Sequence, residues 1–402
     1  MLRVFVPFAL GYFLSYLYRV VNAVIAPDLV RDVGLDANQL GMLTSAYFIT
    51  FAAFQLPLGI LLDRYGPRRT EAGLLLFAAL GAAVFGLAES PAGLIIGRLL
   101  IGFGVSACLM AAFKAFVTWY PAQKLPLING CQMAAGGLGA LAGTVPVEAA
   151  LHVTDWRGVF LVLSGLTLVV AASIFFVVPE HENRPAPSRF GEQLRGIGRI
   201  FTSSLFWRVA PLTVMSQASF LSIQSLWSGP WLRDVAGLDR AAAANQLFLI
   251  ALAMILGFLF MGWAAERLSR RGIQPLSVAT AGMILFMLAQ TAIVAQWTAA
   301  TSVIWIVFGF FGTSGIVPYA ALSQQFPADL AGRLNTGLNL LVFVIAFASQ
   351  WGIGAIINQW PPAAGGGYHP VGYQVAFGIM LALQLLSLCW FVIYRRTGVP
   401  QD

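Results

Sequence analysis

Apolar runs of about 20 residues dominate the sequence and are separated by short breaks rich in glycine, proline and charge. A helix needs about 20 predominantly apolar residues to cross the hydrocarbon core of a bilayer. The pattern therefore predicts an all-α membrane protein with twelve transmembrane helices. They are predicted over residues 4–30, 38–62, 71–89, 91–120, 122–152, 156–178, 206–233, 241–266, 274–295, 297–326, 329–358 and 371–394.

The composition agrees with a chain that lies mostly in lipid. Of its 402 residues, 59% are hydrophobic and only 10% are charged, whereas soluble domains carry about 25% charged residues. The apolar segments leave no room for a sizeable soluble domain. We therefore expect a multi-pass protein of the bacterial inner membrane that contacts membrane lipids and functions as a monomer.

Other classes of protein are disfavoured by the charged and reactive residues. The net charge of +7 arises in the breaks between helices, so it does not indicate a nucleic-acid partner. Cys108, Cys131 and Cys389 lie in apolar segments at spacings that fit neither a disulfide framework nor a metal site. The three histidines lack metal-ligand spacing, and there is no phosphate-binding loop. We expect no enzymatic activity, no metal and no cofactor.

The distribution of basic residues predicts the orientation in the membrane. Arg64, Arg68, Arg267 and Arg271 lie in breaks on one side of the predicted layout, whereas acids match or outnumber bases in the breaks on the other side. Cytoplasmic loops carry the excess of lysine and arginine in most membrane proteins. Both termini are therefore predicted to be cytoplasmic.

The two halves of the chain repeat each other. The segment "PDLVRDVGLDANQL" (27–40) resembles "PWLRDVAGLDRAAAANQL" (230–247), and Pro27 and Pro230 are 203 residues apart. The same offset relates Gly59 to Gly262. We predict two six-helix bundles, residues 1–180 and 206–402, joined by a cytoplasmic linker at 181–205. Such a parallel repeat places a binding site at mid-membrane between the bundles.

A charged loop after the second predicted helix recurs in degenerate form in the second half. Acidic and basic side chains at helix ends can pair in one conformation and separate in another, so we interpret the loop as a conformational latch. Its residues are Gly59, Asp63, Arg64, Gly66 and Arg68, with Glu266 and Arg267 in the second copy. Topology alone would also place arginines here.

These loops resemble the signature of the major facilitator superfamily, over essentially the whole chain. The segment "GRLLIGFGVSA" (97–107) resembles the fourth-helix signature of that family, with Gly102 and Gly104 as close-packing glycines. The resemblance implies a transporter whose two six-helix bundles rock about a central site.

A closer resemblance is to the sugar-phosphate permeases and anion:cation symporters, whose first helix often reads like "YRVVNAVIAP" (18–27). Two positions depart from that branch. Tyr18 stands where the symporters commonly carry an acid, and Ser222 stands where a second arginine would face Arg19 in an organophosphate antiporter. A singly charged anion is therefore favoured over a doubly charged phosphate.

Arg19 is the leading candidate for the anion anchor. It lies about 22 Å along the first predicted helix, too deep for its guanidinium to reach water easily. Tyr12, Ser15 and Asn22 share its helical face, which indicates a water-filled cavity rather than lipid. Arginine can bind a carboxylate with two parallel hydrogen bonds. The alternative is a structural hydrogen bond to backbone carbonyls.

Neutral polar and aromatic residues could hold the body of the substrate. Gln217 and Gln224 are predicted on one face of the seventh helix, with Trp227 one turn later. Trp227 could instead belong to an interfacial belt, and Lys114 could either contact the anion or extend to the membrane surface. The further candidates are Gln132, Asn335 and Asn339.

Three residues are candidates for coupling transport to ions. Arg98 lies within the fourth helix, whereas Glu148 and His152 lie one turn apart near the end of the fifth helix and could pass protons or simply be solvated. The sequence suggests no clearly buried carboxylate in the membrane interior, which would then be net positive. That charge favours anions over cationic drugs.

Together these features predict a secondary active transporter for a small organic anion, with a monocarboxylate favoured. Its cycle would use protons or a counter-substrate. The alternatives are an efflux pump for amphipathic compounds, with the same fold and a looser aromatic cavity, and a transporter-like ligand sensor. No additional signalling domain is visible in the sequence.

Overall fold

The computed structural model describes residues 2–120, 125–180, 198, 200–323, 325–326, 328–363 and 366–396. Within these ranges all regular secondary structure is helical, which confirms the predicted all-α fold. Most of the predicted linker 181–205 lies outside the described residues, as does the side chain of Asp63.

Helices occupy all twelve predicted segments. The first half contains α1 (Leu2–Val20), α2 (Asn22–Val33), α3 (Ala37–Leu87), α4 (Pro91–Gly104), α5 (Cys108–Trp119), α6 (Leu125–Ala142), α7 (Val145–Ala150) and α8 (Trp156–Val177). The second half contains α10 (Ser204–Ser222), η2 (Ile223–Trp227), α11 (Ser228–Asp234), α12 (Arg240–Ser269), α13 (Pro275–Val294), η3 (Thr298–Ala300), α14 (Thr301–Phe311), η4 (Gly312–Ile316), α15 (Val317–Ser323), α16 (Ala328–Ile357) and α17 (Pro370–Arg396).

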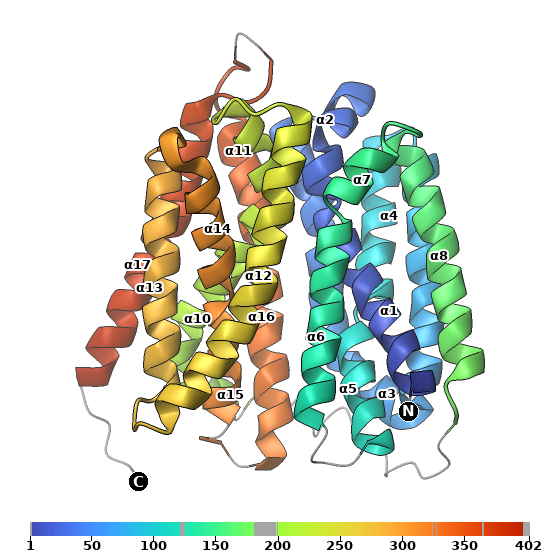
Figure 1. Cartoon of the computed structure of the whole chain (residues 1–402), viewed down its shortest axis with the longest axis vertical. Coiled ribbons are helices and arrows are strands. Elements are labelled where there is room, and N and C mark those ends of the chain that lie inside the picture. The colour runs from blue at the N-terminus through green and yellow to red at the C-terminus, as the bar shows by residue number, and fades with distance from the viewer. Residues whose placement is uncertain are drawn as a thin grey trace.

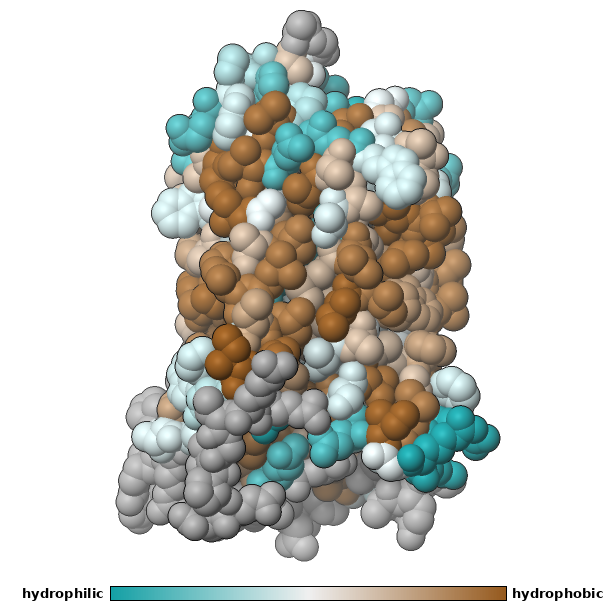
Figure 2. All heavy atoms as spheres, turned by 90° about the vertical axis from the view of Figure 1, so that its left-hand side faces the viewer, coloured by the Kyte–Doolittle hydropathy of each residue, from teal (hydrophilic) through white to brown (hydrophobic). Residues whose placement is uncertain are grey.

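Several of these helices, alone or joined end to end, can cross a bilayer by length and composition. Among the described residues, eight satisfy both conditions, and the count rises to nine if the bent pair α1 and α2 forms one span. Over their described residues, the predicted crossings at 38–62, 122–152 and 206–233 do not satisfy both conditions, although helices occupy them too. On the face of the molecule in Figure 2, apolar side chains fill the middle, and polar side chains gather at the top and at the lower right.

Breaks inside the crossings follow from local sequence. The axis bends by 47° between α1 and α2, and α3 is interrupted at Gly66, whose φ of 77° suits glycine because it lacks a Cβ. Pro67 then begins the next helical segment, a position where its missing N–H does no harm. In the second half, η2 is a π-helical turn between α10 and α11.

Polar residues in the breaks cap the helices that follow them. Asp36 and Gln39 form a reciprocal capping box at the start of α3. Ser90, Asp155 and Asp239 each accept a hydrogen bond from the backbone N–H three residues later, at the starts of α4, α8 and α12. The polar breaks thus define where the helices begin.

The helices of the two halves form two groups that stand side by side (Figure 1). We call the end of the molecule where α1 begins and α17 ends the termini face, and the opposite end, which bears α7 and α11, the distal face. Helices α3 and α16 pack together across the boundary between the halves, as do α6 and α12. The main space between the halves is therefore lined by long helices from both.

Two glycines of α4 allow it to pack closely against α3, as predicted. A Cβ on Gly102 would meet the carbonyl oxygen of Tyr47, and one on Gly104 would meet the backbone of Ala78. Small residues allow such close helix contacts in membrane proteins, where packing rather than water exclusion holds helices together.

We expect Gly104→Ala to lower the melting temperature of the detergent-purified protein, because overpacking costs about 1–3 kcal/mol. Gly165→Ala in α8 is the matched control, since a Cβ there has no atom within 4 Å. Alanine is about 1 kcal/mol better than glycine in a helix interior, so the control should be unchanged or more stable. Equal melting temperatures for the two variants would contradict the close packing of α3 and α4.

Candidate functional site

A cavity of about 350 Å³ lies between the two halves, and we call it the central cavity. Its size lies within the range of small-molecule sites, about 300–1,000 Å³. Helices α1, α3, α5 and α6 contribute from the first half, and α10, α12, α15 and α16 from the second. It is lined by Tyr12, Ser15, Tyr16, Arg19, Phe51, Val105, Leu109, Met110, Phe113, Met133, Gln217, Leu221, Phe258, Ile316, Tyr319, Asn335, Asn339, Val342 and Phe343.

Arg19 projects into this cavity among aromatic rings. Its guanidinium carbon lies 4.4 Å from the ring centre of Tyr16, 5.7 Å from that of Phe51 and 5.5 Å from that of Phe343. Such distances allow cation–π attraction. The Arg19 Nε has no hydrogen-bond partner among the described residues, and no described carboxylate forms an ion pair with it. The cavity therefore holds a cation that lacks a counter-charge.

Hydrogen bonds position the wall beside Arg19. The Tyr47 hydroxyl lies 3.3 Å from both the hydroxyl and the carbonyl oxygen of Ser15. The Tyr47 ring is also 5.8 Å from the Arg19 guanidinium carbon and 5.4 Å from that of Arg98. This single tyrosine thus links α1, α3 and α4 behind the cavity.

Polar groups from the second half face the cavity opposite Arg19. The Gln217 Nε2 is buried and has no hydrogen-bond partner among the described residues. Gly315 makes room for it, because a Cβ at Gly315 would collide with that amide. The Tyr319 hydroxyl lies 3.5 Å from the Asn339 side-chain oxygen. These groups could bind the body of a ligand whose charged head lies at Arg19.

The structure brings six of the predicted binding residues together on this cavity. They are Tyr12, Ser15, Arg19, Gln217, Asn335 and Asn339. On the first helix, the predicted polar face lines the cavity from Tyr12 to Arg19, but Asn22 does not reach the cavity. The axis bends after Val20, and the Asn22 side chain instead donates to the Thr44 hydroxyl at 2.9 Å.

The other predicted binding residues lie away from the cavity. Gln132 is buried and donates to the Phe8 carbonyl at 3.1 Å, and Lys114 is half-buried outside the cavity wall. Gln224 and Trp227 lie in the π-helical turn η2 and do not line the central cavity. The structure therefore brings Gln217 to the cavity without these two predicted binding residues.

Several cavity residues escaped the sequence analysis. Tyr16 stands one turn before Arg19, a spacing that could have identified it. Val342 and Phe343 follow Asn335 and Asn339 at helical spacing along α16, so the sequence could have identified them as well. Tyr319 follows the glycine-rich turn η4, and no sequence pattern marks it as a wall residue.

Three charged residues join the halves at the distal face, and we call them the distal clasp. They are Arg240 of the second half and Asp28 and Glu148 of the first. The Arg240 guanidinium donates from Nη1 to Asp28 at 3.0 Å and from Nη2 to the other oxygen of that carboxylate at 2.5 Å. Its Nε donates to Glu148 at 2.8 Å. Both carboxylates are largely buried. Charge-assisted pairs of this geometry are the stronger kind.

Further contacts close the distal face between α3 and α16. The Trp351 indole donates to the Asn38 side chain at 2.5 Å, and Asn358 donates to Asp36 at 3.4 Å. Gly354 abuts the Ala37 carbonyl, so that no side chain would fit between them. The state described here is therefore closed at the distal face.

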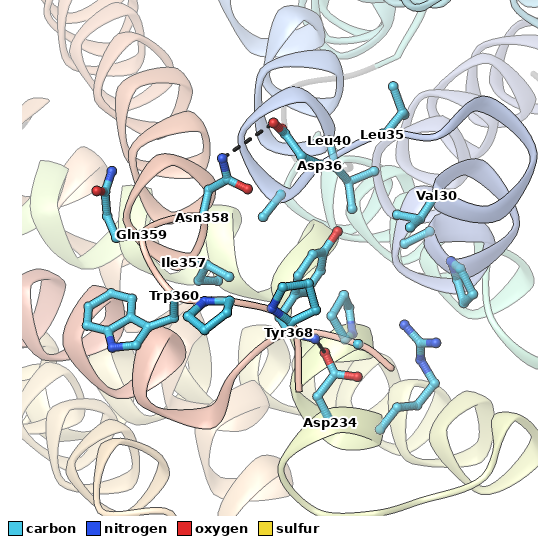
Figure 3. Close-up of a pocket in the computed structure, with 18 residues that line it drawn as sticks. Val30, Leu35, Asp36, Leu40, Asp234, Ile357, Asn358, Gln359, Trp360 and Tyr368 are labelled. Carbon is cyan, nitrogen blue, oxygen red and sulfur yellow. Dashed lines mark hydrogen bonds between the residues drawn. The ribbon is translucent and has the colours of Figure 1, made fainter. Parts of the chain in front are cut away.

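A second cavity, the distal pocket, lies above this closure and has a volume of about 570 Å³. Figure 3 shows Asp36 and Asn358 bonded across it, with Tyr368 and Asp234 on the opposite wall. Asp234 accepts hydrogen bonds from the Tyr368 N–H at 3.0 Å and the Tyr373 hydroxyl at 2.6 Å. Beneath it, the buried Trp227 donates to the Gln350 carbonyl at 3.0 Å. Trp227 therefore packs within the closed distal face and does not line the central cavity.

The candidate coupling residues occupy separate places. Arg98 is buried and donates to the Tyr18 carbonyl at 2.8 Å, in the last turn of α1. Glu148 belongs to the distal clasp, whereas His152 lines a surface pocket nearby. In this state Arg240 binds Glu148, and no hydrogen bond joins Glu148 to His152 among the described contacts.

The described bonds of the latch residues stay within their own halves. Arg68 donates to the Val178 carbonyl at 3.2 Å, and Arg69 pairs with Glu180 at 2.6 Å, just after α8. Glu266 pairs with Arg270 one turn away. Gly59, Arg64 and Arg267 lie on the helices that flank the two loops.

The expectation of an interior without a buried carboxylate is wrong. Glu71 lies in the second part of α3 and is completely buried. The sequence places it only two residues after Arg69, which suggests a solvated helix start. Packing of other helices over this turn buries it instead.

Comparisons with known proteins agree with this architecture. The sequence profile described as "Major Facilitator Superfamily" matches residues 8–350. The chain is 24% identical over 358 residues to a probable sulfoacetate transporter of Cupriavidus necator, with 82% of each chain covered. It is 23% identical over 342 residues to a probable L-galactonate transporter of Escherichia coli K12, covering 78% of this chain and 74% of the relative.

Among solved structures, the fold is similar to that of a bacterial homologue of the human lysosomal transporter Spinster. The TM-score is 0.77 at 16% identity, and 98% of this chain and 96% of the other are covered. At this level of identity the likeness concerns the fold alone.

We expect Arg240→Ala to open the distal face, because it leaves the buried Glu148 carboxylate without its described counter-charge and leaves Asp28 paired only with the exposed Arg31. Leu40, which is buried on the wall of the distal pocket, can be replaced by cysteine as a reporter. The exposed Cys131 and Cys389 would first be changed to serine. In detergent, maleimide labelling of the reporter should become several-fold faster.

Arg270→Ala is the matched control, because Arg270 forms an exposed pair with Glu266 within one helix. Exposed pairs contribute little to stability. Reporter labelling that rises equally in both arginine variants would contradict the role of the distal clasp.

Proposed function

The chain belongs to the major facilitator superfamily, and from this we propose that it is a secondary active transporter for a small organic anion. The carboxylate of the anion binds Arg19 in the central cavity, and the halves 1–180 and 206–402 move about that site by alternating access. A monocarboxylate is the proposed substrate, carried with protons or in exchange for a counter-substrate. The termini face is proposed to be cytoplasmic in a bacterial inner membrane.

One observation carries the proposal, namely that the Arg19 guanidinium, in a cavity between the halves, has no counter-charge among the described residues. A buried cation is costly unless it is paired, and structural arginines usually find a carboxylate or a carbonyl. Arg98 shows that alternative, because it binds the Tyr18 carbonyl. Arg19 is surrounded mainly by rings, so an incoming carboxylate can supply the missing charge.

The cavity suits a small anion that bears polar groups. Tyr12, Ser15 and Tyr16 lie on the same helix as Arg19, and Gln217 and Asn339 face them from the second half. A ligand that touches both halves is bound most tightly when the halves enclose it, which links binding to movement. The relatives named for sulfoacetate and L-galactonate transport support a carboxylate substrate for this chain.

An efflux pump for amphipathic compounds is the second candidate. The observation that favours it is the apolar part of the lining, where Phe51, Phe113, Phe258, Phe343 and Met110 gather. Such a pump would be stabilised by lipophilic compounds of either charge. A thermal-stabilisation screen in detergent with galactonate, lactate, sulfoacetate and a lipophilic cation separates the two candidates.

We expect Arg19→Ala to lower counterflow of radiolabelled galactonate in proteoliposomes about ten- to a hundredfold. A hydrogen bond to a charged group contributes about 1.5–3 kcal/mol, which corresponds to that range. Arg19→Lys should recover only part of the rate, since an ammonium lacks the planar two-donor geometry.

Arg270→Ala is again the control, because it removes an equal charge from an exposed pair far along α12. If wild-type protein carries galactonate, lactate or sulfoacetate and Arg19→Ala carries it equally well, the anchor role of Arg19 is refuted. If none of the three anions is carried by the wild type, the proposed substrate class is refuted.

A further inference from the structure

A buried acid in the first half has no place in the transport cycle described so far. Glu71 lies in α3, five residues after the break at Gly66, and none of its surface is exposed. It does not line the central cavity. A completely buried ionisable group inside a membrane protein is a strong functional candidate, because burying it is costly.

Three other helices pack against the Glu71 carboxyl. Its Oε1 occupies the space that a side chain at Gly11 of α1 would fill, and Ile174 of α8 lies beside the same spot. The Cys108 thiol of α5 is the titratable group in contact with it. No nitrogen or oxygen donor reaches either carboxyl oxygen among the described residues.

Among the described residues, no ion pair joins Glu71 to a basic side chain of α1, α3 or α5. Arg68 and Arg69 bind the Val178 carbonyl and Glu180 at the end of α8. Arg19 is on the same helix as Gly11 but eight residues further along, which is about 12 Å. On α5, Lys114 lies six residues beyond Cys108. Among the described residues, Glu71 is thus packed without a cation bonded to its carboxyl.

An ionised carboxylate cannot be held stably in such surroundings. Moving an unpaired charge from water into an apolar interior costs far more than binding a proton. The arrangement of α1, α3, α5 and α8 seen here therefore requires the neutral acid. Because Gly11 has no side chain, the Glu71 carboxyl fits against α1 at that position.

The site lies one layer behind the central cavity. Gly11 directly precedes Tyr12, and Cys108 directly precedes Leu109, and both of these following residues line the cavity. Movement of α1 or α5 during transport must therefore change the surroundings of Glu71 and of Arg19 together. This shared dependence is what coupling between a proton and an anion requires.

We propose that Glu71 is the proton-binding site of this transporter. It carries a proton in the distal-closed state described here, and it exchanges that proton with water when α1 and α5 move and water reaches the carboxyl. This proposal rests on the proposed transport function and selects protons over a counter-substrate as the coupling partner. Because the proton is bound in the distal-closed state, that state is favoured at low pH and disfavoured as pH rises.

Two assays of Glu71→Gln test the proposal, since glutamine keeps the shape of the neutral acid and cannot release a proton. In proteoliposomes, the variant should retain galactonate counterflow within about threefold of wild type. Its accumulation of galactonate driven by a proton gradient should fall at least tenfold. Glu71→Asp, which keeps a titratable group, should restore part of that accumulation. Proton-driven accumulation that survives in Glu71→Gln would overturn the proposal.

The second assay needs no transport. With the Leu40→Cys reporter in detergent, maleimide labelling in excess of that of the same protein without the reporter cysteine, corrected for thiol ionisation, should rise with pH in the otherwise wild-type protein. In Glu71→Gln it should stay low at every pH. A flat profile in the wild-type background, or the same rise in Glu71→Gln, would overturn the proposal even if the variant were poorly folded in liposomes.

The two assays also separate this proposal from the one on which it rests. If the wild type carries none of the tested anions but the labelling assay shows a pH dependence that Glu71→Gln abolishes, the substrate assignment fails and the proton site stands. If anions are carried and the pH dependence persists in Glu71→Gln, the proton site fails and the anion assignment stands.

Discussion

Arg240 joins the two halves of the protein at the distal face, and the remaining features of this state depend on that bond. The guanidinium spans Asp28 and Glu148 from two different helices of the first half. With the three charges satisfied there, α3 and α16 can approach until Gly354 meets the Ala37 backbone and Trp227 is enclosed. The distal pocket and the central cavity are then separate spaces.

The interior arginines differ in how their charge is satisfied, and this difference assigns their roles. Arg98 binds a carbonyl at the end of α1 and so fixes the helix that carries Arg19. Arg240 is neutralised by carboxylates across the boundary between the halves. Arg19 has aromatic rings and no described carboxylate. An anion bound to Arg19 would contact both halves, since Phe343 and Gln217 of the second half line the same cavity.

The fold was predictable because its determinants are local. Runs of about 20 apolar residues, capped by Asp36, Ser90, Asp155 and Asp239, locate the helices, and these requirements of a bilayer hold whatever the neighbours do. Binding residues on regular helix, such as Tyr12, Ser15, Asn335 and Asn339, were predictable for the same reason. Three predicted residues that do not line the cavity lie beside irregular turns: Asn22 follows the α1–α2 bend, and Gln224 and Trp227 lie in η2.

By itself, the sequence determined the all-α fold, the internal repeat and the depth of Arg19 in its helix, because these follow from spacing along one chain. Only the tertiary structure decided which charges meet. It pairs Arg240 with Asp28, 212 residues away, turns Gln132 and Asn22 toward structural hydrogen bonds, and buries Glu71 against Gly11. Partners for polar groups come from neighbouring helices, and the pattern within one helix carries no record of which neighbour will face it.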